Sequence, residues 1–186
     1  MNSITLHTDG SCNPSNPGPG GIGYIVRYTQ MKDNVPEVTE SVHSQGYKLS
    51  TNNRMELLAA IQGMAGIISN IENKTYENVT KLNVCADSTY LTDAINQKWL
   101  DSWRQKNWQT SQNTAVKNKD LWEQIIQILE KLRSINVGYT FTHVAGHQGD
   151  EFNERCDKLA SEAAKSDNRI EDTVYESQYK QRGEKN

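Results

Sequence analysis

The first third of the chain alternates polar and apolar residues in short runs, a pattern typical of strands with one buried face. The run that ends at Asp9 and the two that follow predict strands at residues 3–8, 21–29 and 39–49. Residues 10–21 are rich in Gly, Pro, Asn and Ser and predict a loop, and residues 30–38 predict a turn. Connections of this size suit antiparallel neighbours, so a meander is expected.

The apolar period changes at residue 51. Met55, Leu58, Ala59 and Ala65 recur at helical spacing and predict a helix over 51–71 whose start Thr51 or Asn52 can cap. The remaining pattern predicts two strands and three helices. The strands are expected at 81–86 and 137–144, and the helices at 88–97, 120–134 and 150–164.

This order predicts a mixed α/β fold, a five-stranded mixed sheet with helices on both faces. Three strands come first as a meander, and helices join the later ones. Residues 1–165 are expected to form one domain, and residues 166–186 a polar, flexible tail. The chain has 186 residues, which suffices for one domain with a sizeable core.

Composition narrows the class of protein. The apolar runs are too short to span a bilayer, and the first residues lack the pattern of a secretory signal. Cys12, Cys85 and Cys156 are far apart, so neither a disulfide framework nor a structural zinc site is expected, and a reducing cytoplasm fits. For the oligomeric state, a monomer is expected by default. The net charge of −3 argues mildly against a nucleic-acid binder unless positive charge is concentrated locally.

Four acidic residues occupy suggestive positions. Asp9 and Asp87 end the first and fourth predicted strands, Glu56 lies early in the first helix, and Asp157 lies on the last helix. In open α/β sheets, ligands bind outside the carboxyl ends of the strands. If the first and fourth strands are neighbours, Asp9 and Asp87 meet there, and the two helical carboxylates project onto the same place.

Clustered carboxylates repel one another unless a cation neutralises them. Mg²⁺ prefers carboxylate, water and phosphate oxygens, and two such ions about 4 Å apart can hold the attacking and leaving oxygens of a phosphodiester. The four acids therefore predict a site for two Mg²⁺ (or Mn²⁺) ions. The alternative is structural, because Asp before Gly or Ser also serves as an ordinary turn or cap residue.

Four motifs follow one another along the chain: TDGSC…NPGPGGIGY (8–24), STNNRMELLAAI (50–61), ADSTYL (86–91) and GHQGDEFNERCDKLA (146–160). Together they closely resemble the bacterial type 1 ribonucleases H, over about residues 3–164. This resemblance implies a metal-dependent endonuclease that hydrolyses the RNA strand of RNA–DNA hybrids and leaves 3′-hydroxyl and 5′-phosphate ends.

The resemblance also assigns roles to single residues. It implies that Asp9, Glu56, Asp87 and Asp157 are the catalytic, metal-binding carboxylates. It implies that His147 assists proton transfer or product release; by its local sequence alone, His147 would be a solvated loop residue. Substrate contacts are expected from small and polar residues near these acids: Gly10, Ser11, Asn16, Thr51, Asn52, Asn53, Ser88 and Thr89.

Residues 98–119 combine positive charge with aromatic rings. Five basic residues stand against one acid, and three tryptophans recur at spacings of four and five. Cations attract phosphates and aromatic faces pack on sugars or bases, and the resembled family carries a basic protrusion here. Contacts with the nucleic acid are therefore expected from Trp99, Trp103, Arg104, Lys106 and Lys117. The alternative is a small aromatic core that supports the segment, which we expect to include Trp103.

Other functions stay open at this level. A junction resolvase, DNA exonuclease or transposase core would share the carboxylate cluster and would cleave DNA. A hybrid-binding protein without catalysis and a domain of a reverse transcriptase polyprotein are further alternatives. Some features depart from the common bacterial pattern: longer segments at 13–15 and 72–80, and Asp150, which is expected to cap the last helix.

Overall fold

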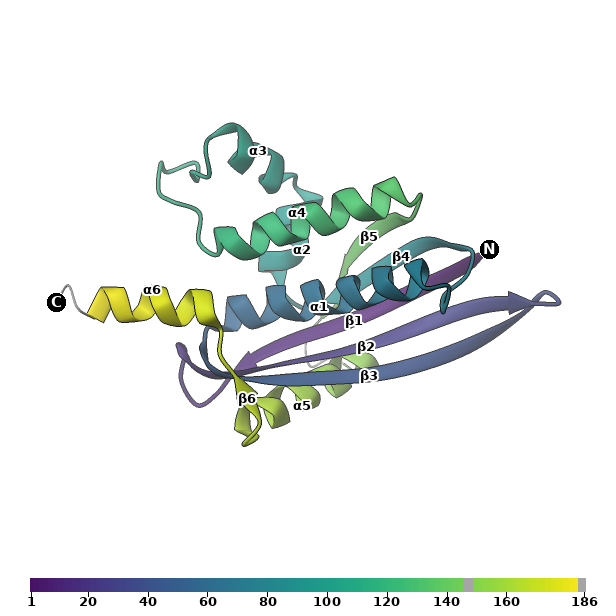
Figure 1. Ribbon diagram of the computed structural model, residues 1–186, viewed down its shortest axis with the longest axis horizontal. Coiled ribbons are helices and arrows are strands. Elements are labelled where there is room, and N and C mark those ends of the chain that lie inside the picture. Colours follow the sequence, from purple (N-terminus) through teal and green to yellow (C-terminus); the bar gives the residue numbers. More distant parts are fainter. Residues whose placement is uncertain (146–148, 184–186) are drawn as a thin grey trace.

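The chain folds around a mixed six-stranded sheet (Figure 1). The computed structural model describes residues 1–145 and 149–183. β1 pairs antiparallel with β2, and β2 with β3, whereas β4 runs parallel to both β1 and β5. The strand order is β5-β4-β1-β2-β3-β6. The bounds are β1 (Asn2–Cys12), β2 (Gly18–Lys32), β3 (Val35–Ser50), β4 (Val79–Ala86), β5 (Gly138–His143) and β6 (Arg169–Ile170).

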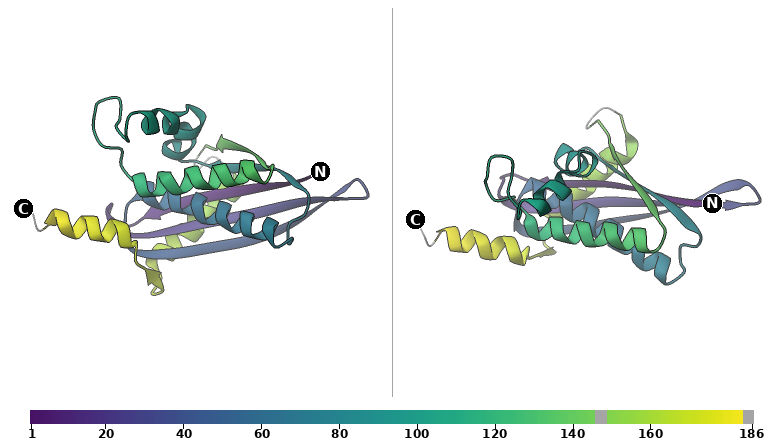
Figure 2. Two further views of the ribbon diagram at one scale, coloured as in Figure 1. Left: turned by 45° about the horizontal axis from the view of Figure 1, so that its top comes forward. Right: turned by 90° about the horizontal axis from the view of Figure 1, so that it is seen from above.

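Helices cover both faces of this sheet (Figure 2). Leu6 of β1 packs against Gly63 of α1, whereas the next residue, His7, stacks on Phe152 of α5. Alternate strand residues point to opposite faces, so α1 and α5 lie on opposite sides. The bounds are α1 (Asn52–Glu72), α2 (Thr89–Asn96), α3 (Trp99–Gln105), α4 (Lys119–Ser134), α5 (Glu151–Lys165) and α6 (Thr173–Gly183). The predicted mixed α/β class with helices on both faces is confirmed.

The larger hydrophobic core fills the space between the sheet, α1 and α4. Leu6 and Val84 from the sheet, Met64 from α1 and Trp122 from α4 are all fully buried within it. Among the described residues, no helix combines the length and the apolar character needed to cross a membrane.

The first hairpin is longer than predicted. The sequence predicts that the first strand stops at Asp9, but β1 continues to Cys12, because residues 10–12 pair with the glycine-rich start of β2 at residues 20–22. The predicted loop at 10–21 therefore shrinks to residues 13–17. Asp9 lies inside a strand and not at its end.

The predicted turn at 30–38 is also wrong in extent, since only two residues separate β2 from β3. Asp33 and Asn34 both have positive φ, at 50° and 65°. Two successive residues of this kind match the turn that suits the twist of a two-residue hairpin, and Asp and Asn tolerate it better than most residues.

The C-terminal segment differs most from the prediction of a flexible tail. β6 adds a sixth strand to the free edge of β3, and α6 follows it. Between them Asp172 is buried, where its carboxylate accepts hydrogen bonds from Arg54 Nε at 2.6 Å and Ser50 Oγ at 2.8 Å. Arg54, only 1% exposed, also donates two hydrogen bonds to Asp120 at the start of α4. A buried guanidinium thus holds three distant segments together.

Loss of this buried partner should destabilise the protein. Asp172→Ala leaves part of the Arg54 guanidinium unpaired inside the protein, and we expect the free energy of unfolding to fall by about 3 kcal/mol in urea denaturation. The matched control is the neighbouring Glu171→Ala, which removes only an exposed ion pair with Lys48. That change should cost less than about 1 kcal/mol. Equal, small losses in both variants would contradict the inferred role of Asp172.

Candidate active site

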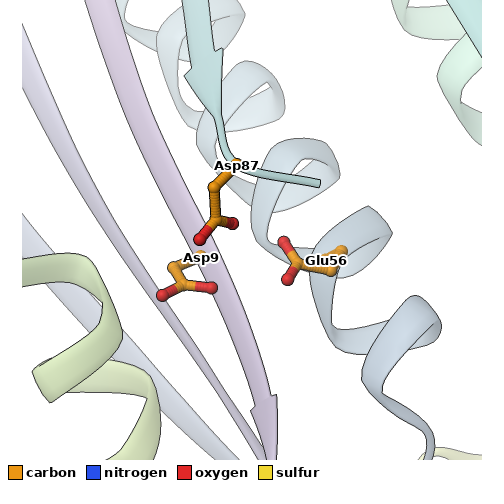
Figure 3. A group of neighbouring side chains, drawn as sticks. All are labelled: Asp9, Glu56 and Asp87. Atoms are coloured by element: carbon orange, nitrogen blue, oxygen red, sulfur yellow. The ribbon is translucent and has the colours of Figure 1, made fainter. Parts of the chain in front are cut away.

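Three carboxylates from three different elements meet at one end of the sheet. Asp9 lies on β1, Glu56 on α1, and Asp87 directly after β4. One oxygen of each lies within 4.8 Å of the others, and Figure 3 shows the three groups facing a common space. Asp9 and Glu56 are each only 5% exposed, and Asp87 is half-buried.

Strand pairing brings the two aspartates together. β1 and β4 are parallel neighbours in which Thr8 pairs with Ala86, so the residues that follow, Asp9 and Asp87, emerge side by side. The first and fourth strands are therefore neighbours, the condition under which the sequence analysis expected Asp9 and Asp87 to meet.

Glu56 reaches the same place because α1 lies against the β1 backbone. A Cβ at Gly10 would lie 2.3 Å from the Glu56 backbone nitrogen, so only glycine fits there. Thr51 caps the helix by accepting a hydrogen bond from Arg54 N at 3.4 Å, which fixes the start of the helix one turn before Glu56. Gly10 thus has a packing role in addition to lining the cleft.

Asp157 approaches from the opposite side on α5. It is half-buried and lines the same cleft of about 370 Å³ as the other three acids. The approach of α5 depends on glycines in β2: a Cβ at Gly21 would lie 2.1 Å from Ala160 O, and one at Gly23 would lie 2.4 Å from Cys156 O. The four predicted carboxylates therefore share one cleft, with three in a tight group.

Burial and mutual repulsion make this cluster costly in its ionised form. Burial, and then the charges of Asp87 and Asp157, raise the pKa of Asp9 to about 7. Burial and the neighbouring charges of Asp9 and Asp87 raise the pKa of Glu56 well above its ordinary range. Within the described residues Glu56 Oε2 is buried and has no hydrogen-bond partner. Such an oxygen beside two other carboxylates fits a hard divalent cation.

Asn153 belongs to the site although the sequence analysis did not single it out. Its amide nitrogen donates to Asp87 Oδ2 at 3.3 Å, and its side chain is buried. It lies one helical turn before Asp157 on α5, a spacing that could have suggested a shared face. Asp150 caps this helix as predicted, accepting hydrogen bonds from Phe152 N and Asn153 N at 3.0 Å each. Asn153 thus holds the Asp87 carboxylate in place.

Six of the predicted substrate-contact residues line this cleft. Its lining includes Gly10, Ser11, Asn52, Asn53, Ser88 and Thr89, and adds Tyr90, which the sequence analysis missed. Asn16, Thr51 and Lys117 instead line an adjoining groove, which shares Asn53 with the cleft. Asn16 Oδ1 accepts a hydrogen bond from Asn52 N at 3.1 Å, which ties the 13–17 loop to the start of α1.

In the basic segment at residues 98–119, the tryptophans are half-buried whereas the cations are exposed. The half-buried rings of Trp99 and Trp103 lie 6.1 Å apart, and Trp103 packs edge-on against the buried Trp122 of α4 at 5.5 Å. Arg104 and Lys106 are exposed, and Arg104 forms an exposed ion pair with Glu130 at 3.3 Å. The structure therefore favours the supporting aromatic core, and it confirms packing of Trp103. His147 lies outside the described residues.

Comparison with known proteins agrees with this geometry. The family model described as RNase H matches residues 1–165. The chain belongs to the ribonuclease H family. As a member it is a metal-dependent ribonuclease. The residues matched by the family model end just before the segment that forms β6 and α6.

Bacterial ribonucleases H resemble it over nearly their whole length. A curated Ribonuclease H of Lachnoclostridium phytofermentans is 39% identical over 176 residues, covering 93% of this chain and 99% of the relative. A Ribonuclease HI of Haemophilus ducreyi is 40% identical, with 95% and 99% covered. Among solved structures, LC9-RNase H1, described as a type 1 RNase H with the type 2 active-site motif, superposes with a TM-score of 0.67 at 24% identity, covering 87% of this chain and 72% of that chain.

Removal of one buried charge should make the metal-free ribonuclease H more stable at high pH. Because the pKa of Asp9 is raised in the folded state, the native protein holds a proton that the unfolded chain releases above about pH 4. Stability of the metal-free wild type therefore falls as pH rises toward about 7. Asparagine does not ionise, so the Asp9→Asn variant does not lose stability in this way as the pH rises. We expect it to melt several degrees above wild type at about pH 8 and close to wild type at about pH 5, in the presence of chelator.

The control is Asp33→Asn, the same chemical change in the exposed hairpin turn, which should alter melting little at either pH. A difference between Asp9→Asn and wild type that does not depend on pH would contradict the electrostatic explanation.

Proposed function

We propose that this ribonuclease H cleaves the RNA strand of RNA–DNA hybrids with two divalent cations held by Asp9, Glu56, Asp87 and Asp157. The observation that carries the proposal is the group of three carboxylate oxygens within 4.8 Å of one another, from three elements of the fold. Bound Mg²⁺ or Mn²⁺ would supply an activated water and charge stabilisation for the departing 3′-oxygen, which gives 3′-hydroxyl and 5′-phosphate products.

The chain's own residues hold and orient the substrate in this proposal. The cleft walls carry hydroxyl and amide groups, from Ser11, Asn52, Asn53 and Ser88, that can donate to phosphate oxygens and to ribose hydroxyls. The ribose 2′-hydroxyl both donates and accepts hydrogen bonds and distinguishes RNA from DNA. Asn153 keeps the Asp87 carboxylate oriented. His147 keeps its proposed role in proton transfer or product release.

A hybrid substrate is supported by one structural relative. LC11-RNase H1, solved in complex with an RNA/DNA hybrid, superposes with a TM-score of 0.57 at 24% identity, covering 87% of this chain and 96% of that chain. The exposed cations Arg104, Lys106 and Lys117 would approach the backbone of such a duplex. Trp99 and Trp103 would support the basic segment on the side that faces away from the duplex. We also propose a cytoplasmic location, because the three cysteines are free, as is usual in a reducing compartment.

Cleavage assays test the proposal. Wild-type protein should cut the RNA of a uniform hybrid in Mg²⁺, leave single-stranded RNA, double-stranded RNA and double-stranded DNA intact, and lose activity with chelator. Asp87→Asn should lower the rate at least ~100-fold because it removes a proposed metal ligand. Asp33→Asn, which is remote from the cleft, should cut at the wild-type rate.

Three results would overturn the proposal. Metal-dependent cutting of DNA duplex would favour a resolvase or exonuclease. Tight hybrid binding without cleavage would favour a binding module. Full activity of Asp87→Asn would show that the site is misassigned.

A further inference from the structure

A second groove adjoins the catalytic cleft. It has a volume of about 490 Å³ and shares Asn53 with the cleft. One wall is the stretch from Ala115 to Asp120 that leads into α4, and another is the loop and helix start that carry Asn16 and Thr51. The third wall is α6, through Tyr175 and Gln178. In Figure 1, α6 lies beside the start of α1, as this lining requires.

The position of α6 is fixed by the buried ion network. Asp172, the residue before α6, bonds Arg54 and also caps the helix, accepting hydrogen bonds from Tyr175 N at 3.4 Å and, through its backbone oxygen, from Glu176 N at 2.9 Å. The Tyr175 ring lies 5.7 Å from the Arg54 guanidinium carbon. Arg54 stands two residues before Glu56, so the same helix that carries a catalytic carboxylate also anchors α6.

The groove has the chemistry of a site for a sugar–phosphate backbone. Its lining includes the amide residues Asn16, Asn53 and Gln178 and the lysines Lys117 and Lys119. The Lys119 ammonium also forms an exposed ion pair with Glu123 at 3.5 Å. The acid in the lining, Asp120, is engaged by two hydrogen bonds from Arg54. Amide donors and ammonium groups of this kind position nucleic-acid backbones without reading bases.

We propose that α6 is part of the nucleic-acid surface and that Gln178 contacts the duplex backbone beside the cleavage site. This inference rests on the proposed function and extends it to a segment beyond the matched family region. Because Gln178 lines the groove and not the catalytic cleft, it acts on substrate affinity and leaves the chemical step unchanged.

Steady-state hybrid cleavage by the full chain tests this contact. Gln178→Ala should raise KM about 3- to 10-fold at unchanged kcat, since a hydrogen bond to a charged phosphate is lost. Gln178→Glu should raise KM further, because its charge repels phosphate, and this extra effect should shrink at high salt. The matched control is Gln181→Ala, an identical change at an exposed α6 residue outside the groove lining, which should keep the wild-type KM.

A chain that ends at Thr173 provides a second measurement, since it removes most of α6 and keeps Asp172 on Arg54. Its KM should rise at least as much as that of Gln178→Ala. Wild-type KM in Gln178→Ala, or equal KM increases in Gln178→Ala and Gln181→Ala, would overturn the inference while hybrid cleavage by wild type upholds the proposed function. Failure of wild type to cleave hybrid would instead overturn the proposed function, and this inference with it.

Discussion

The burial of mutually repelling carboxylates at the junction of β1, β4 and α1 is the constraint on which the rest of the structure depends. Ionising Asp9 and Glu56, each only 5% exposed, costs free energy that a bound cation would recover. The surrounding fold enforces this proximity. Parallel pairing of β1 with β4 sets the two aspartates side by side, and Gly10 lets α1 approach closely enough to add Glu56. The cluster is therefore destabilised without metal and prepared to bind it.

A second buried charge, on the same helix, organises the surfaces around the cleft. Arg54 joins the end of the basic segment through Asp120 to the C-terminal segment through Asp172. Glu56, two residues later, faces the cleft. α1 thus connects the carboxylate cluster with two walls of the adjoining groove. The tryptophans extend this support, because Trp103 packs on Trp122 and leaves the cations of the segment facing solvent.

The chemistry of the site was more predictable from sequence than the edges of the fold. The four carboxylates stand in local sequence motifs, whereas the adjacency of the first and fourth strands was settled only by the strand pairing. The C-terminal segment has no such local signal: β6 has two residues, and the order of α6 depends on a bond between Arg54 and Asp172, 118 positions apart. Asn153 was missed because its role appears only once α5 packs beside Asp87. From the sequence alone, the tryptophans could belong to a hydrophobic core or contact the nucleic acid. Only their contacts in the structure distinguish these two roles.

Cation binding at the carboxylate cluster can be measured directly by calorimetric titration of Mn²⁺ into wild-type protein and Glu56→Gln. The titration is run near pH 6.5 in two buffers of different ionisation enthalpy. Since the pKa of Asp9 is raised to about 7, much of the metal-free protein carries a proton there that binding must displace. We predict saturable binding whose heat depends on the buffer, weakened at least ~10-fold by Glu56→Gln. Buffer-independent heat, or equal affinity in both proteins, would contradict a metal site formed by these buried acids.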